Sequence, residues 1–189
     1  ISNPQTMPQL LDISNLVKQR NNKTLFALKI NNDPEDTAGA KLMESAAKLA
    51  SATDNKLVQI MKCDLNIANC IINTVQSNKI TDLIVGIHHK ANIVDTFLGG
   101  MITSLINGTS NQNLIIYGPK KPINSVKRLV VAVPQMAELE VGFDIWFDRI
   151  KNIASQLSIP IVFYANKVTT AALKKQCEIM RFAALYKLS

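Results

Sequence analysis

The sequence is poor in the residues from which catalytic and metal sites are usually built. Its 189 residues include two histidines and three cysteines. The cysteines, Cys63, Cys70 and Cys177, are too few and too scattered for a disulfide framework or a zinc site. The histidine pair His88-His89 has no acid or cysteine at a convincing ligand spacing, and neither a P-loop nor a Gly-x-Ser-x-Gly motif occurs. We therefore expect no metal and no enzymatic activity.

Aromatic residues are also scarce, at 5% of the chain, although the net charge is +7. Surfaces that bind single-stranded nucleic acids combine a basic groove with aromatic side chains on which bases stack. The basic residues here are dispersed rather than gathered in a run, so we expect no nucleic-acid partner. The basic residues Lys120-Lys121 and Lys127-Arg128 favour a solvated linker, with an anionic membrane leaflet as the alternative partner.

Long hydrophobic runs are absent, since the apolar stretches are far shorter than the roughly 20 residues needed to cross a bilayer. We expect no transmembrane segment in the chain. Its start, Ile1-Ser2-Asn3-Pro4, has no charged or apolar leader and no Met, so we expect it to be part of a longer protein. Hydrophobic residues nevertheless make up 47% of the sequence, which is enough for a buried core.

Short apolar stretches alternate with segments of helical periodicity through the first 118 residues. The expected strands are 24–30, 56–61, 83–85 and 114–117, and the segment 1–4 is either the end of a strand whose start is missing or a bare lead-in. The expected helices are a segment from Thr6 that Arg20-Asn21-Asn22 ends, then 36–52, 66–75 and an apolar segment before 114. This alternation predicts an α/β fold, namely an open five-stranded parallel sheet with helices on both faces and Rossmann-like connections.

A linker then separates a second, similar pattern from the first. We expect one domain at 1–118, a Pro- and Gly-containing linker at 119–125, and an incomplete second copy at 126–189. The elements expected in the second copy are a strand at 126–133, a helix at 137–157, a strand at 160–165 and a helix from 169 to 180. The tail Phe182–Ser189 is predicted to be too short for further strands, and the broken periodicity at 182–186 suggests that residues are absent there.

An aromatic cluster in the second copy is formed by Phe143, Trp146 and Phe147. Its helical spacing favours a core position over a partner surface, which remains the alternative. In the first copy, the segment 86–100 follows a predicted strand. Because open parallel sheets bind ligands at the carboxyl ends of their strands, we expect any small-molecule site to lie there.

The segment from Asp82 to His88, followed by Gly99-Gly100 after an apolar helix start, resembles the universal stress protein family. The lead-ins Ile1–Pro4 and Val131–Pro134 resemble the first strand of that family. The tandem layout is similar to the paired universal stress domains at the cytoplasmic C-terminus of bacterial sodium/proton antiporters. The resemblance implies an adenine nucleotide alpha hydrolase-like fold, covering the first copy and about half of a second.

Nucleotide-binding members of the family have a loop with glycine, two residues, glycine, nine residues, glycine, and then serine or threonine. Gly86 and Gly99 match the first and third glycines, whereas His89 holds the second glycine position and Gly100 the hydroxyl position. The acidic residue that often ends the family's first strand is replaced by Ser2 and, in the second copy, by Met136. These departures predict a degenerate nucleotide loop.

The resemblance therefore implies a set of nucleotide-facing residues: Ser2, Ile30, Gly86, His88, His89, Gly99 and Gly100. It also implies a non-catalytic regulatory module on the cytoplasmic side of the inner membrane, attached to an antiporter's transmembrane domain that precedes the chain. The two copies are expected to pair within one chain or in a homodimer. No cofactor is expected, and the alternative is a free-standing tandem universal stress protein that binds ATP or AMP.

Overall fold

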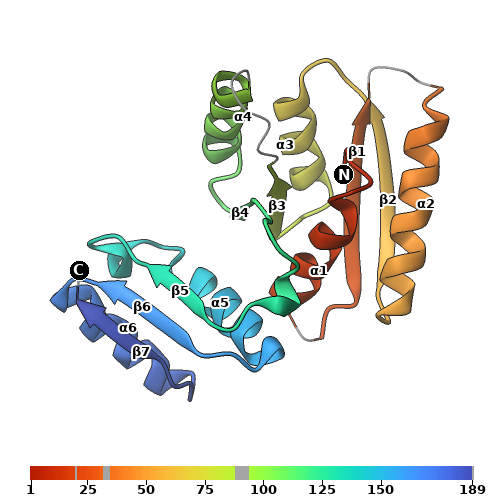
Figure 1. Cartoon of the computed structure of the whole chain (residues 1–189). Helices are drawn as coiled ribbons and strands as arrows, with labels where there is room; N and C mark the ends of the chain where they lie inside the picture. The colour runs from red at the N-terminus through yellow and green to blue at the C-terminus, as the bar shows by residue number, and fades with distance from the viewer. Residues whose placement is uncertain (20, 32–34, 88–93, 189) are drawn as a thin grey trace. The chain divides into compact units, whose positions relative to one another are not determined.

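The computed structural model describes residues 1–19, 21–31, 35–87 and 94–188, and their fold is a mixed α/β arrangement of parallel strands and helices. The chain divides into two compact units, whose helices and strands are labelled in Figure 1. Unit 1 comprises Ile1–Asn15 and Arg20–Lys120, and unit 2 comprises Leu16–Gln19 and Lys121–Ser189. The division after Lys120 falls inside the segment 119–125 that the sequence marks as a linker.

Unit 1 alternates helices and strands along the chain. Its elements are α1 (Met7–Val17), β1 (Thr24–Asn31), α2 (Thr37–Ala52), β2 (Lys56–Cys63), α3 (Ile67–Ser77), β3 (Asp82–Gly86), α4 (Val94–Gly108) and β4 (Asn113–Tyr117). β1 pairs with β2 in parallel from Thr24↔Lys56 to Asn31↔Cys63. β3 pairs with β4 in parallel from Asp82↔Asn113 to Gly86↔Tyr117. The predicted alternation of strands and helices is therefore confirmed.

The predicted five-stranded sheet is not what the described strands form, because β1-β2 and β3-β4 are separate two-stranded sheets. The expected strand end at Ile1–Pro4 is not a strand either. The carbonyl oxygen of Asn3 accepts from the Thr6 and Met7 N–H groups at 3.3 and 3.0 Å, which forms a turn before α1. The segment is therefore the lead-in to α1, which is the second of the two interpretations that the sequence leaves open.

Helix starts are set by short polar side chains. Asp36 Oδ1 accepts from the Gly39 N–H at 2.7 Å before α2, and Asn66 Oδ1 accepts from the Asn69 N–H at 3.0 Å before α3. Such a cap satisfies one of the N–H groups that a first helical turn leaves unpaired, and it stabilises a helix by about 1 kcal/mol in typical cases. The capping residues thus determine where each helix follows its strand.

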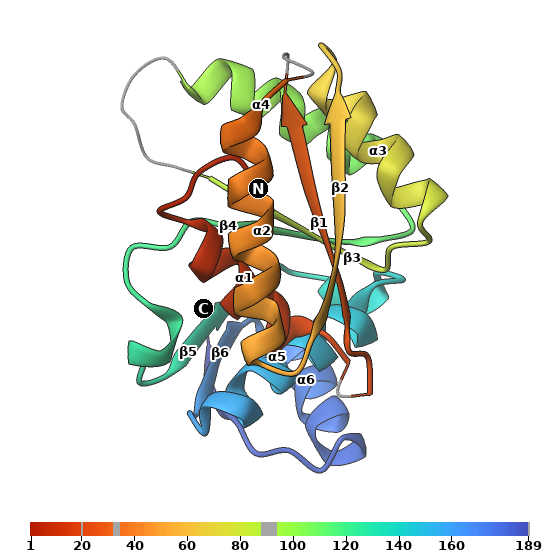
Figure 2. The same cartoon turned by 90° about the vertical axis from the view of Figure 1, so that its right-hand side faces the viewer.

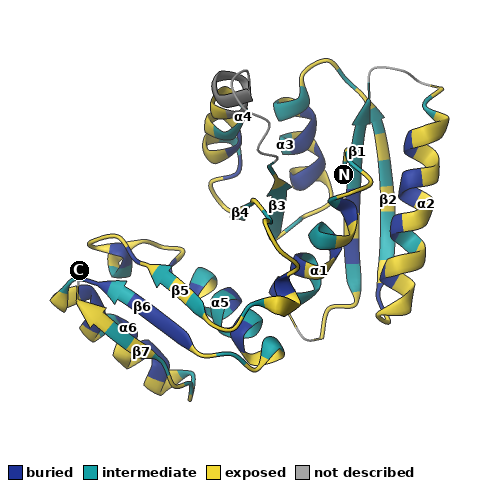
Figure 3. Ribbon diagram, in the orientation of Figure 1, coloured by how far each residue is buried: buried dark blue, intermediate teal, exposed yellow. Residues whose placement is uncertain are grey.

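Helices cover both faces of the β1-β2 layer (Figure 2). On one face Met7 and Leu11 of α1 pack with Leu25 of β1 and with Leu42 and Ala46 of α2. The other face is covered by α3 and α4, where the buried residues Ile71, Val75 and Leu105 form the centre of a cluster. The cluster on this face also includes partly buried strand residues, namely Leu28, Ile30, Leu83, Val85 and Leu114. Figure 3 shows α2 with a buried side and an exposed side, as expected for an amphipathic helix.

Unit 2 consists of one three-stranded parallel sheet in the order β5-β6-β7 with two long helices. Its elements are η1 (Ile123–Ser125), β5 (Leu129–Ala132), η2 (Ala137–Leu139), α5 (Phe143–Leu157), β6 (Ile161–Ala165), α6 (Lys167–Ile179) and β7 (Leu185–Leu188). β7 corrects one prediction, because the tail does supply a further strand. It pairs with β6 from Val162↔Leu185 to Ala165↔Leu188.

The single helix predicted at 137–157 is also corrected. The structure has the short 3-10 helix η2, and α5 begins only at Phe143 after the N-cap residue Gly142. The interruption has a local cause, since Met136 adopts a left-handed conformation with φ 65° and the Glu140 N–H bonds back to the Ala137 carbonyl. The chain therefore makes a tight turn after β5 before the long helix starts.

The core of unit 2 is built around aromatic rings. Phe147 and Phe163 are each 1% exposed and stack with centroids 5.6 Å apart, and Phe163 stacks on Tyr186 at 6.0 Å. Phe143 is buried and meets Trp146 edge-on at 5.2 Å. The structure thus confirms the core interpretation of the aromatic cluster on α5.

Candidate functional site

Gly86, the first glycine of the predicted loop, is the exposed last residue of β3. A Cβ built on Gly86 would lie 3.0 Å from a Cδ atom of Leu10 on α1. The absence of a side chain at Gly86 therefore lets α1 approach the carboxyl end of β3. Glycine at this position has a packing reason that does not require a ligand.

The remaining residues predicted for this segment are the pair His88-His89 and the pair Gly99-Gly100. His88 and His89 lie outside the described residues. Gly99 and Gly100 lie inside α4, which begins at Val94, so both glycines follow a helix start, as the sequence indicates. Among the described residues, nothing lies within 4 Å of a Cβ built on either glycine, and their carbonyls accept from the Thr103 and Ser104 hydroxyls at 2.9 and 3.0 Å. Their predicted part in nucleotide binding stays a prediction.

Ser2 and Ile30 are brought to the same part of unit 1. The Ile1 nitrogen donates a hydrogen bond to the Leu28 carbonyl oxygen, so the lead-in lies along β1. Ser2 is exposed, whereas Ile30 is partly buried and packs in the cluster under α3 and α4. Ser2 and Ile30, two of the seven predicted residues, thus lie close to the carboxyl end of β1, but the Ser2 side chain faces solvent and the Ile30 side chain packs in the core.

A polar cluster at the carboxyl end of β1 was missed by sequence reasoning. The Asp36 carboxylate lies 3.7 Å from Lys29 Nζ and accepts from Asn31 Nδ2 at 3.4 Å, in addition to capping α2. The Gly39 N–H and, secondarily, Asn31 and Lys29 hold the pKa of Asp36 below its usual range. The Asp-Pro-Glu-Asp run before α2 was a usable signal, since a cap belongs there.

The carboxyl end of the unit 2 sheet has a second polar contact. The Thr169 hydroxyl, 0% exposed, donates to Glu138 Oε2 at 2.8 Å, and the Thr169 N–H donates to the Asn166 side chain at 2.8 Å. These bonds connect the turn after β5 to the first turn of α6. Met136 is exposed, and Glu138 two residues later supplies a carboxylate at this end.

An open depression of about 500 Å³ lies beside α6 and β7. Its lining residues are Lys174, Cys177, Glu178, Arg181, Phe182, Ala183, Ala184 and Tyr186. Within it the Tyr186 hydroxyl lies 2.9 Å from Cys177 Sγ, and Lys174 Nζ lies 5.5 Å from the Tyr186 ring centroid. Burial raises the pKa values of both Cys177 and Tyr186.

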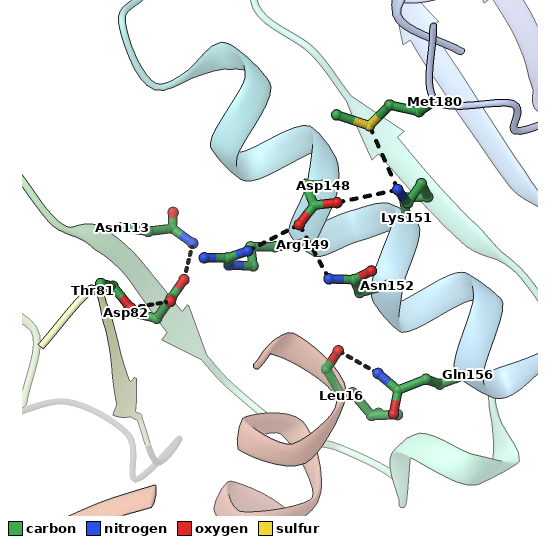
Figure 4. A network of polar contacts seen from close by, with 10 residues as sticks. All are labelled: Leu16, Thr81, Asp82, Asn113, Asp148, Arg149, Lys151, Asn152, Gln156 and Met180. Atoms are coloured by element: carbon green, nitrogen blue, oxygen red, sulfur yellow. Dashed lines mark hydrogen bonds and ion pairs between the residues drawn. The ribbon is translucent and has the colours of Figure 1, made fainter. Parts of the chain in front are cut away.

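Figure 4 shows further polar contacts that hold elements in place. Asp82 Oδ1 accepts from Asn113 Nδ2 at 3.0 Å, which joins the amino ends of β3 and β4. On α5, Asp148 forms ion pairs with Arg149 at 3.0 Å and Lys151 at 3.2 Å. Each of these contacts joins residues of the same unit and so helps to hold its elements in place.

Two features are absent from the described ranges. No group of three or more His, Cys, Asp or Glu residues there is arranged to hold a metal ion. Nor does any described helix combine the length and apolarity that crossing a membrane requires. In comparisons with known proteins, no family model, no curated protein and no solved structure matches the chain.

Proposed function

We propose that the chain is a non-catalytic, universal stress-like regulatory module of a cation (sodium)/proton antiporter. In this proposal the module lies on the cytoplasmic side of the inner membrane, and the antiporter's transmembrane domain precedes it in the same protein. The module changes transport in response to a ligand or a partner rather than by turning over a substrate.

The observation that carries the proposal is the repeated arrangement of the two units. In unit 1 the order is helix α1, strand β1, capped helix α2 and parallel strand β2. In unit 2 the order is helix α5, strand β6, capped helix α6 and parallel strand β7. A tandem of similar parallel α/β units is what the resemblance to paired universal stress domains implies.

The polar groups at the strand ends support a role without catalysis. Asp36 is held by Gly39, Lys29 and Asn31, and Glu138 accepts from a buried hydroxyl. A catalytic carboxylate or thiol needs a pKa near the working pH and access to substrate. The lowered pKa of Asp36 and the raised pKa of Cys177 move both groups away from that range.

The proposal is tested with the purified chain and with the intact gene product. The purified chain should release no more phosphate from ATP than a buffer control, and robust turnover would overturn the non-catalytic claim. The coding sequence ahead of Ile1 should encode about a dozen apolar spans of roughly 20 residues each. A gene without them would contradict the antiporter context.

A second candidate, binding of ATP or AMP by a free-standing tandem protein, is favoured by the position of Gly86. This glycine ends β3 at the carboxyl side, where parallel sheets bind nucleotides. A nucleotide at 100 times its dissociation constant should stabilise the fold by about 2.7 kcal/mol, which a thermal-shift series with ATP and AMP would detect. No shift at millimolar nucleotide would remove this candidate.

A further inference from the structure

The open depression beside α6 and β7 has an apolar floor. Phe182, Ala184 and Tyr186 line it and also pack against the unit 2 core. The Tyr186 ring stacks on Phe163 at 6.0 Å, and its hydroxyl donates to Cys177 Sγ at 2.9 Å. Because that hydroxyl already has an acceptor, the floor offers mainly aromatic and aliphatic surface. A volume of about 500 Å³ lies in the range of cavities that take small molecules.

Three exposed, charged side chains line the same depression, namely Lys174, Glu178 and Arg181. Lys174 and Glu178 are one turn apart on α6, and Arg181 follows the end of this helix. Lys174 Nζ lies 5.5 Å from the centroid of the Tyr186 ring. Among the described residues, no ion pair joins these three side chains to one another or to a further side chain. Two positive charges and one negative charge are therefore available to a ligand.

The signs of these charges favour a zwitterion over a simple anion. A guanidinium such as that of Arg181 can bind a carboxylate through two parallel N–H···O bonds, and the Lys174 ammonium adds a second positive charge. Glu178 would repel a simple anion, and so would the end of α6, because the last carbonyls of a helix carry partial negative charge. Both would attract an ammonium group.

We propose that this depression binds an aromatic α-amino acid. The carboxylate of the ligand meets Arg181 and Lys174, and its ammonium group meets Glu178. Its ring lies on the floor formed by Phe182 and Tyr186, because aromatic rings pair in stacked or edge-on contacts. This inference does not depend on the proposed function, since it concerns binding to unit 2 alone.

The probes are L-phenylalanine and two analogues, each added to the full chain. Hydrocinnamate lacks the ammonium group and phenethylamine lacks the carboxylate. Binding is followed through the backbone amide NMR signals of residues 174–186. L-Phenylalanine should bind with a dissociation constant of about 1 mM, because an open depression covers only part of a ligand. Each analogue should bind at least about tenfold more weakly, since it loses one charged contact. No signal change with L-phenylalanine at about 20 mM, or an analogue that binds as tightly, would overturn the proposal.

Arg181→Gly separates binding from folding. Arg181 has a φ of 49°, a left-handed conformation that glycine adopts without steric cost at the end of a helix. The variant should therefore unfold at a temperature no lower than the parent, yet bind L-phenylalanine at least about tenfold more weakly. The matched control is Lys175→Gln, because Lys175 is an exposed cation of α6 that does not line the depression. Its affinity should stay within about twofold of the parent.

Glu178→Gln tests the contact with the ammonium group. This variant should lose the preference for L-phenylalanine over hydrocinnamate, because hydrocinnamate has no ammonium group for Glu178 to attract. Unchanged affinity in Arg181→Gly, or an unchanged preference in Glu178→Gln, would overturn the proposal. An equal loss of affinity in Lys175→Gln would overturn it as well, since the effect would then be one of net charge. If Arg181→Gly does not fold, Lys174→Gln takes its place against the same control.

Discussion

Replacement of Phe147 by alanine should remove the centre of the unit 2 core. The ring is 1% exposed, stacks on Phe163 at 5.6 Å and lies 6.0 Å from Trp146. A Phe→Ala change at such a site costs about 3–5 kcal/mol, the sum of lost burial and the cavity left behind. Ordinary domains are stable by only about 5–15 kcal/mol. Phe147→Ala should therefore unfold unit 2 at much lower urea concentration than the parent chain.

Trp146 is the only tryptophan in the sequence and lies in this core, so its fluorescence reports the unfolding of unit 2. The control is Leu139→Ala, because Leu139 is 72% exposed and its truncation should change the free energy of unfolding by no more than about 0.5 kcal/mol. A loss below about 1 kcal/mol for Phe147→Ala would refute the packing that we describe, since the ring would then not be buried as the structure has it.

Three further predictions concern the polar groups and thiols. Because the folded-state pKa of Asp36 is lowered, its carboxylate stabilises the fold above about pH 4 and this stabilisation is lost as the pH falls through the lowered pKa. Asp36→Asn should therefore unfold at a lower temperature than the parent at pH 7, and the two should converge in acid. Native protein should react with a thiol reagent only at the exposed Cys63, and reaction of all three thiols without denaturant would contradict the burial of the other two. Thr169→Val should cost about 1–3 kcal/mol by removing the donor to Glu138, measured as a lower urea midpoint of Trp146 fluorescence.

The alternation of strands and helices could be predicted because it depends on local patterns. The apolar run 24–30 predicts a strand and the periodicity of 66–75 predicts a helix, and both elements are present in the structure. The aromatic spacing on α5 likewise predicted a buried face. Such features are set by residues a few positions apart in the sequence.

The features that the sequence did not predict depend on distant partners or backbone conformation. β7 forms because Leu185–Leu188 pair with β6. This segment is short and its side chains are partly exposed, so its sequence does not predict a strand. The turn at Met136 requires a positive φ at a residue other than glycine, which sequence patterns rarely reveal. The cluster of Lys29, Asn31 and Asp36 likewise needs the fold to bring the end of β1 to the start of α2.

The most direct test of the regulatory role is sodium/proton exchange in everted membrane vesicles. The intact gene product is compared with a version that lacks residues 1–189, and exchange is followed as the sodium-dependent collapse of a proton gradient. We predict that the truncated protein still exchanges the two ions but with an altered dependence on pH or sodium concentration. An intact protein that performs no cation/proton exchange, or a truncation that leaves both dependences unchanged, would contradict the account.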